Sequence, residues 1–333
     1  MESASVVVQA IHPESPGFDV LARLLKGAAD PLRLEVLRTL SQDSFGVTEL
    51  CRIFDISQPA MSHHLKVLAE AGLVSRRREG TSIYYRRAIP TELNDAGALV
   101  DALLGAVDAL TPSDAVNRRI DMIRAERAKS SQDFFASNAE RFSAQEELIA
   151  PRQQYLDQLQ LVVSHYADQN ADALELGPGE GWLLPILATH FGAVKGVDNS
   201  PEMLAQAGTY PDITDNPRIE LVCGDHVTAA ALGQDKQLVV ANMVLHHTAS
   251  PATVVAELAR CLIPGGILLI NELCAHDQGW VRDACGDVWL GFEPEQLSAW
   301  AEAAGLIDGE SIYLALRNGF RVQMRLFHSP LSK

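Results

Sequence analysis

The sequence predicts two domains of different class, a small α+β domain followed by a doubly wound α/β domain. The chain has 333 residues, which is long enough for two hydrophobic cores. Short amphipathic helices and one alternating hairpin occupy the first hundred residues, whereas strands and helices alternate in the last part of the chain. We therefore expect domains at 1–112 and 167–333, joined by a helical connector at 113–166.

The composition is that of a soluble globular protein, with 47% hydrophobic and 21% charged residues. No apolar stretch is long enough to cross a membrane, and Met1-Glu2-Ser3 lacks the basic start of a signal peptide. We therefore expect a cytoplasmic protein. The five cysteines form no C-x-x-C pair, which argues against a disulfide framework or a zinc knuckle.

The first domain contains a predicted helix-turn-helix. Leucines at helical spacing and the Asp30-Pro31 helix start indicate short helices, expected at 18–27, 30–40, 47–54 and from Ser57 onward. The last two are joined by a three-residue turn, and in this arrangement the second helix enters the major groove of DNA. The DNA-contacting residues predicted on it are Gln58, Pro59, Ser62, His63 and Lys66.

An arginine-rich hairpin follows this helix. Residues 74–78 and 82–86 alternate around a turn at Glu79-Gly80, as the wing of a winged helix does. The formal net charge of the chain is −16, yet residues 57–88 carry six basic side chains against two acidic ones. Because phosphate contacts depend on local charge, this patch indicates a nucleic-acid surface, and the alternative is a solvated hairpin. The predicted wing contacts are Arg76, Arg77, Arg78 and Arg86.

Three sequence runs in this domain carry a family resemblance. They are Asp30-Pro31-Leu32-Arg33, Ser57-Gln58-Pro59-Ala60-Met61-Ser62-His63-His64-Leu65-Lys66-Val67-Leu68 and Ala71-Gly72-Leu73-Val74. Through these runs, residues 17–110 resemble the ArsR/SmtB family of winged-helix repressors. The resemblance implies a double-stranded DNA operator and a homodimer. The dimerisation stripe would be Leu93, Leu99, Val100, Leu103, Leu104 and Val107, unless that helix packs only on its own domain.

The metal sites of that family are not matched. The arsenic site needs neighbouring cysteines on the third helix, where Cys51 stands alone, and the zinc site needs histidines on a last helix that has none. One soft ligand does not hold a metal tightly. No metal is therefore predicted.

The second domain is organised around the loop Glu175-Leu176-Gly177-Pro178-Gly179-Glu180-Gly181. An apolar run leads into it and a helical pattern leaves it, so the glycines lie at a strand-to-helix turn where the backbone can approach a ligand. Asp198 ends the next predicted strand and can accept hydrogen bonds from both ribose hydroxyls. The E-x-G-x-G-x-G spacing differs from the dinucleotide fingerprint G-x-G-x-x-G, and Glu175 suits a cation better than a pyrophosphate.

Later motifs strengthen this assignment. Residues 312–316 and 320–327 flank Asn318-Gly319, which predicts a final antiparallel hairpin. With Ser200-Pro201-Glu202-Met203-Leu204, Gly224-Asp225 and the run 241–247, residues 170–330 resemble class I S-adenosylmethionine-dependent methyltransferases, although Gln237 stands where relatives usually carry Asp. The resemblance implies S-adenosylmethionine or S-adenosylhomocysteine as cofactor. Its binding residues would be Glu175, Gly177, Gly179, Gly181, Asp198, Asn199, Met203, Asp225, His226 and Asn242.

Candidate catalytic residues are His246, His247 and Glu272, which follow predicted strand ends. They form no diagnostic set of a base and its orienting group, and a capping or packing role is the alternative. The connector residues Phe134 and Phe135 resemble the aromatic cover of the cofactor in small-molecule methyltransferases, although an ordinary linker helix would also explain them.

Two complete signatures in one chain, with no intact metal site in the first and no obvious base in the second, favour a repressor. Its methyltransferase-like domain would bind S-adenosylmethionine or S-adenosylhomocysteine as effector. The alternative is an active small-molecule methyltransferase with an autoregulatory DNA-binding domain. A third hypothesis is arsenite methylation, in which Cys274 and Cys285 would lie near the pocket mouth. Whether the chain is an enzyme is left open.

Overall fold

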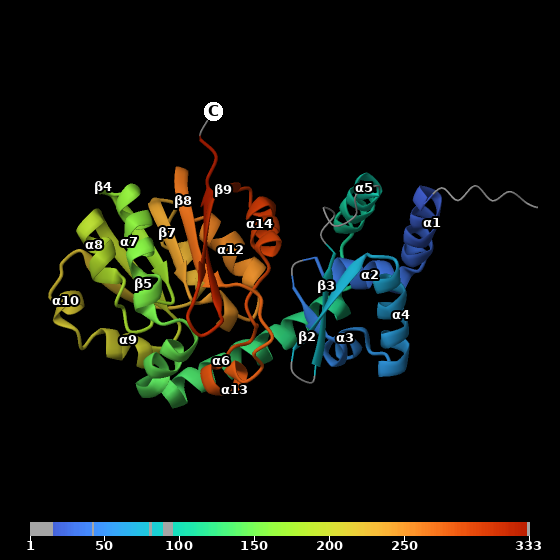
Figure 1. The fold of residues 1–333 in the computed structure, drawn as a ribbon, viewed down its shortest axis with the longest axis horizontal. Helices are drawn as coiled ribbons and strands as arrows, with labels where there is room; N and C mark the ends of the chain where they lie inside the picture. The colour runs from blue at the N-terminus through green and yellow to red at the C-terminus, as the bar shows by residue number, and fades with distance from the viewer. Residues whose placement is uncertain (1–15, 42, 80–81, 89–95, 332–333) are drawn as a thin grey trace, which may run out of the picture. The chain divides into compact units, whose positions relative to one another are not determined.

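The computed structural model describes residues 16–41, 43–79, 82–88 and 96–331 (Figure 1). Two compact units divide the chain: the first contains residues 1–77 and 85–112, and the second contains residues 78–84 and 113–333. Within the described ranges, no helix combines the length and apolar character needed to cross a membrane.

The first unit contains the predicted helix-turn-helix. Its elements are α1 (Pro16–Ala28), α2 (Pro31–Thr39), β1 (Phe45–Gly46), α3 (Val47–Phe54) and α4 (Gln58–Glu70). Asp30 caps α2, since one of its side-chain oxygens accepts the backbone N–H of Arg33 at 3.0 Å. Asp55 adopts a left-handed conformation after α3 and so ends that helix before the turn into α4.

The wing is the hairpin of β2 (Val74–Glu79) and β3 (Ser82–Arg87), and β1 pairs with β3. Helix α5 (Gly97–Asp108) follows, and its residues Val100, Leu104 and Val107 are buried. Arg87 joins the wing to this helix, because its two terminal nitrogens lie 3.0 Å from the two carboxylate oxygens of Asp108. The predicted stripe therefore packs partly on its own unit; Leu93 lies outside the described residues.

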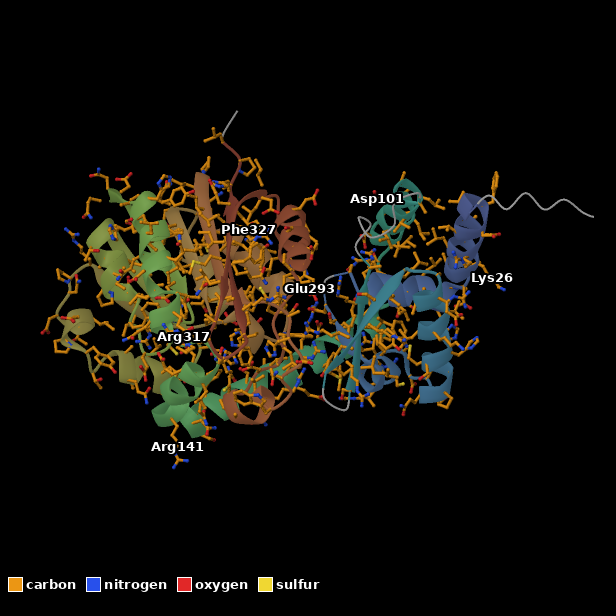
Figure 2. The ribbon with its side chains drawn as sticks, viewed as in Figure 1. Lys26, Asp101, Arg141, Glu293, Arg317 and Phe327 are labelled. Atoms are coloured by element: carbon orange, nitrogen blue, oxygen red, sulfur yellow. The ribbon has the colours of Figure 1, made fainter. Side chains whose placement is uncertain are left out.

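The second unit begins with helices. Helix α6 (Asp114–Ile149) has Ser113 as its cap, and η2 (Arg152–Gln154) and α7 (Leu156–His165) follow. Arg141 of α6 is exposed and projects outward, whereas Phe327 lies among the packed strands (Figure 2).

Seven of the described strands form one sheet in the order β6-β5-β4-β7-β8-β10-β9. Neighbours among the first five are parallel, and β10 is antiparallel to both β8 and β9, which confirms the predicted doubly wound sheet with a final hairpin. The strands are β4 (Asp168–Leu176), β5 (Phe191–Asp198), β6 (Ile219–Cys223), β7 (Lys236–Asn242), β8 (Leu262–Leu273), β9 (Ile307–Ala315) and β10 (Arg321–His328).

Helices cover both faces of this sheet (Figure 1). Leu238 and Val240 of β7 belong to one hydrophobic cluster, whereas Val239 and Ala241 belong to another. The first cluster includes residues of α7 and α8 (Leu184–His190), and the second includes residues of α12 (Pro251–Ala259) and α14 (Pro294–Ala303). Burial on both faces explains the nearly continuous apolar strands. The remaining short helices are α9 (Pro201–Ala207), α10 (Pro211–Thr214), α11 (His226–Ala231), η3 (Leu245–His247) and α13 (Val281–Cys285).

Candidate functional site

The glycine loop follows β4, which lies between β5 and β7, where the direction of strand winding changes. Gly177, Gly179 and Gly181 have φ angles of +65°, +57° and +79°, which L side chains rarely adopt. A Cβ atom on Gly177 would lie 2.4 Å from Cγ2 of Val244. The loop therefore requires glycine there for both its backbone conformation and the space available.

Asp198 connects this loop to the end of β5. The backbone N–H of Gly179 donates to Oδ2 at 3.2 Å, and that of Ser200 donates to Oδ1 at 2.9 Å. Burial raises the pKa of this carboxyl, and the backbone donors act in the opposite direction. A carboxylate oxygen has more than one lone pair, so Asp198 can still accept a ligand hydroxyl.

One cavity of about 400 Å³ lies against the loop. The predicted cofactor residues in its wall are Gly177, Gly179, Asp198, Asn199, Met203, Asp225 and His226. Asp225 accepts the backbone N–H groups of Val227 and Thr228, each at 3.0 Å. Burial acts against its ionisation, but these donors and His226 outweigh burial and lower the pKa of Asp225. A second carboxylate is thus available on the cavity wall.

The other three predicted cofactor residues lie outside this wall. Gly181 packs against Ile213, and Asn242 accepts a hydrogen bond from the Asn271 side chain at 2.8 Å. Glu175 is buried, and its Oε2 has no hydrogen-bond partner among the described residues. Burial, followed by the charges of Asp198 and Glu146, raises the pKa of Glu175 to about 8. This acid is therefore buried inside the unit and does not face the cavity.

Helix α6 supplies one side of the wall, which sequence reasoning identified only through Phe134 and Phe135. The lining residues of α6 recur at helical spacing on one face, namely Arg124, Ala125, Ala128, Ser131, Gln132 and Phe135. The ring of Phe135 lies 5.0 Å from the ring of His247, centroid to centroid, in a T-shaped arrangement. The Arg127 guanidinium lies 4.6 Å above the Trp289 ring. These contacts dock α6 across the strand ends that bear the ligand loops.

The candidate catalytic residues meet at the end of β7. His246 Nδ1 lies 2.6 Å from Oε1 of Glu272, and both side chains are buried. Burial alone would lower the pKa of His246, but the charge of Glu272 outweighs it and raises the pKa. Burial lowers the pKa of His247, which lines the cavity. Asp287 belongs to the same group, because one of its carboxylate oxygens lies within 4.8 Å of ring nitrogens of His246 and His247. The backbone N–H groups of Val288 and Trp289 donate to the carbonyl oxygen of His246 and hold this segment in place, which no sequence motif indicated.

The structure contradicts one expectation about the cysteines. Cys274 and Cys285 are buried and lie outside the wall of the large cavity, so they are not at a pocket mouth. Burial raises the pKa of the Cys285 thiol to about 12. Such thiols are neutral and poor metal ligands or nucleophiles near pH 7.

The predicted DNA-contacting residues of α4 form one exposed surface. Gln58, Pro59, Ser62, His63 and Lys66 are all exposed, while Met61, Leu65 and Leu68 of the same helix are buried. On the wing, Arg76 and Arg78 are exposed, and Arg77 and Arg86 are half-buried. The polar side chains of α4 thus have the accessibility that contact with base edges requires.

Two family models match the two parts of the chain separately. Residues 30–76 match the family model for bacterial regulatory proteins of the arsR family, and residues 174–270 match the methyltransferase domain model. A biofilm growth-associated repressor of Agrobacterium fabrum is 46% identical over 83 residues, which are 25% of this chain and 68% of that protein. Nodulation protein NolR of Rhizobium meliloti is 32% identical over 112 residues, 33% of this chain and 92% of that protein.

Among solved structures, a chain of the Haloferax volcanii complex between the Trm112 methyltransferase activator and a methyltransferase is similar to the second unit in fold. It is 19% identical, covers 61% of this chain and 98% of its own length, and has a TM-score of 0.51. At this identity the likeness concerns the fold alone.

Proposed function

Because the chain belongs to the ArsR family of bacterial regulatory proteins and carries a methyltransferase domain, we propose that it is a transcriptional repressor controlled by an adenosyl ligand. The effector is S-adenosylmethionine or S-adenosylhomocysteine, bound in the cavity beside the glycine loop. The operator is double-stranded DNA, read by α4 and the wing.

One observation carries this proposal: the helix that leaves the DNA-binding unit also lines the ligand cavity. Helix α6 begins at Asp114, two residues after Pro112 ends the first unit, and its residues 124–135 contribute to the cavity wall. A ligand in the cavity therefore contacts the segment that connects the two units. Ligand binding is linked to DNA binding only if the ligand contacts α6 differently in two conformations of the chain.

The chemistry of the wall supports an adenosyl ligand. Asp198 and Asp225 provide carboxylate acceptors for ribose hydroxyls and the adenine edge. Met203 and Phe135 provide apolar surface that suits a flat base.

A homodimer is part of the proposal. Helix α1 exposes Phe18 and Leu25, at 71% and 58% of their surface, and Leu110 after α5 is 61% exposed. Half-buried Leu99 and Leu103 add to the apolar surface of α5. These exposed apolar side chains are available for an interface with a second copy of the chain. Sedimentation equilibrium of the full chain should give twice the monomer mass of 36.2 kDa; a monomer at micromolar concentration would contradict the dimer.

The test of ligand control measures DNA affinity at saturating ligand. A labelled duplex selected by the protein from a random-sequence pool is titrated with protein alone, with S-adenosylmethionine and with S-adenosylhomocysteine. We expect at least one ligand to change the Kd by roughly 10-fold or more, which corresponds to about 1.4 kcal/mol of coupling. The affinity of that ligand should change by the same factor when the duplex is present.

The test variant is Ser131→Ala, which removes a single hydroxyl from the α6 wall of the cavity. The matched control is Ser164→Ala on α7, which lies outside that cavity. The first variant should change the coupling and the second should not. If both ligands bind tightly and leave the DNA affinity unchanged, the proposal of an effector is wrong.

A second candidate function is small-molecule methyl transfer. It is favoured by the pairing of His246 with Glu272 at 2.6 Å, next to His247 on the wall of the large cavity. Turnover of S-adenosylmethionine with a small-molecule amine or hydroxyl acceptor, lost in Glu272→Gln, would support it. The burial of Cys274 and Cys285 gives no support to arsenite as the acceptor.

A further inference from the structure

Two imidazoles and one carboxylate meet inside the second unit. His246 and His247 end η3 after β7, and Asp287 follows α13 in the segment between β8 and α14. One ligand-type atom from each residue lies within 4.8 Å of the others, and all three residues are buried. Metal bonds to nitrogen and oxygen are about 2.0–2.2 Å long, so small side-chain rotations would place these atoms around one ion.

The carboxylate of Asp287 is the strongest indication that a ligand belongs here. Its side chain is 0% exposed, and neither Oδ atom has a hydrogen-bond partner among the described residues. The Nδ1 atom of His247 lies 3.9 Å from Oδ1, too far for a hydrogen bond. Buried carboxylates in proteins are normally paired, hydrogen-bonded or bound to a metal, because desolvation is costly.

His246 is held in the orientation that a metal ligand needs. Its Nδ1 contacts Glu272 Oε1, and Glu272 Oε2 accepts the backbone N–H of His246 at 3.2 Å. This arrangement fixes the ring and leaves Nε2 as the nitrogen available for an ion. Metal-binding histidines commonly donate their second ring N–H to a carboxylate in this way.

The space at the cluster fits an ion and excludes a substrate. A cavity of about 10 Å³ is bordered by His246, His247, Asp287, Glu146 and Cys285. That volume holds about one water-sized particle. His247 and Met243 border both this small cavity and the large ligand cavity.

We propose that His246, His247 and Asp287 bind one divalent transition-metal ion in the second unit. Two imidazoles and one carboxylate suit Zn²⁺ and its neighbours in the first transition series better than Mg²⁺, which prefers oxygen ligands. The site is independent of the proposed effector, since it requires neither DNA nor an adenosyl ligand.

The experiment uses the full chain after treatment with EDTA. Zn²⁺ binding is measured by competition with a chromophoric chelator, and Co²⁺ is added separately to record visible d–d absorption. We expect one site per chain, weaker by more than about 10-fold in Asp287→Asn, which keeps the shape of the side chain and removes its charge. Glu272→Gln, which contacts His246 rather than the ion, should weaken binding by about 10–100-fold.

The matched control is His190→Ala. His190 ends α8 in the same unit and lies outside the cluster, so its replacement should leave the affinity unchanged. If Asp287→Asn does not fold, Glu272→Gln and thermal unfolding of the unaltered chain with and without Zn²⁺ decide the question, because an ion that binds the folded state raises Tm. The proposal is overturned if the protein neither binds Zn²⁺ nor gives Co²⁺ absorption. It is also overturned if Asp287→Asn and Glu272→Gln both bind Zn²⁺ as tightly as the unaltered chain.

Discussion

Replacing Gly177 by alanine should destabilise the second unit and prevent ligand binding. The φ angle of +65° costs an L residue about 1–2 kcal/mol. The new Cβ would also lie 2.4 Å from Val244 Cγ2, and overpacking of this kind costs about 1–3 kcal/mol. The two effects together predict a loss of about 2–5 kcal/mol in the free energy of unfolding.

Gly305→Ala separates the two contributions. Gly305 also has a positive φ angle, +80°, but no described atom lies within 4 Å of its added Cβ. This control should lose only the conformational part, about 1–2 kcal/mol. The difference between the two variants is then the cost of the contact with Val244, about 1–3 kcal/mol.

Denaturant unfolding followed by tryptophan fluorescence provides the measurement. All four tryptophans lie between residues 182 and 300, so the signal reports the second unit alone. Calorimetric titration with S-adenosylhomocysteine should show binding to Gly305→Ala and none to Gly177→Ala, since both Gly177 and Val244 border the cavity. Equal stabilities, or unchanged ligand affinity in Gly177→Ala, would refute the reasoning.

Three further predictions address the DNA surface, the buried acid and the ribose site. Lys66→Ala should weaken binding to all duplexes and reduce the slope of log K against log salt concentration by about 1. Lys26→Ala on α1 is the control and should change neither quantity. Equal slopes for the two variants would contradict a phosphate contact by Lys66. The raised pKa of Glu175, about 8, means that the folded state holds this proton more tightly, so wild-type stability falls between about pH 5 and 8. The free energy of unfolding of Glu175→Gln should therefore rise relative to that of wild type across this range, by up to a few kcal/mol at about 1.4 kcal/mol per pKa unit. A stability difference between the two proteins that does not vary with pH would contradict this prediction. Asp198→Asn should lower S-adenosylhomocysteine affinity roughly 10–100-fold by weakening charged hydrogen bonds, as measured by calorimetry, and an unchanged affinity would place the ribose elsewhere.

Local patterns were sufficient to predict most of the elements. The helix start at Asp30, the turn before α4 and the hairpin around Asn318-Gly319 each depend on a few neighbouring residues. The glycine loop and Asp198 were also recognisable, because backbone conformation and strand ends leave signatures within short stretches.

The residues that line the two cavities could be identified only from the fold. Phe135 and Ser131 belong to a long helix of ordinary polar composition, and only the path of α6 over the strand ends makes them face the large cavity. Asp287 lies 40 residues from His247, and Cys285 was expected near a pocket mouth yet lies inside the unit.

The sequence alone therefore determined which elements form, the family of the first unit and the type of loop in the second. Tertiary structure alone decided that Glu272 orients His246, that Asp287 lies close to the two histidines and that α6 lines the large cavity. The physical reason is the order of the strands. β4 lies between β5 and β7, and β8 lies beside β7, so the loops after these strands meet at one edge of the sheet although they are far apart along the chain.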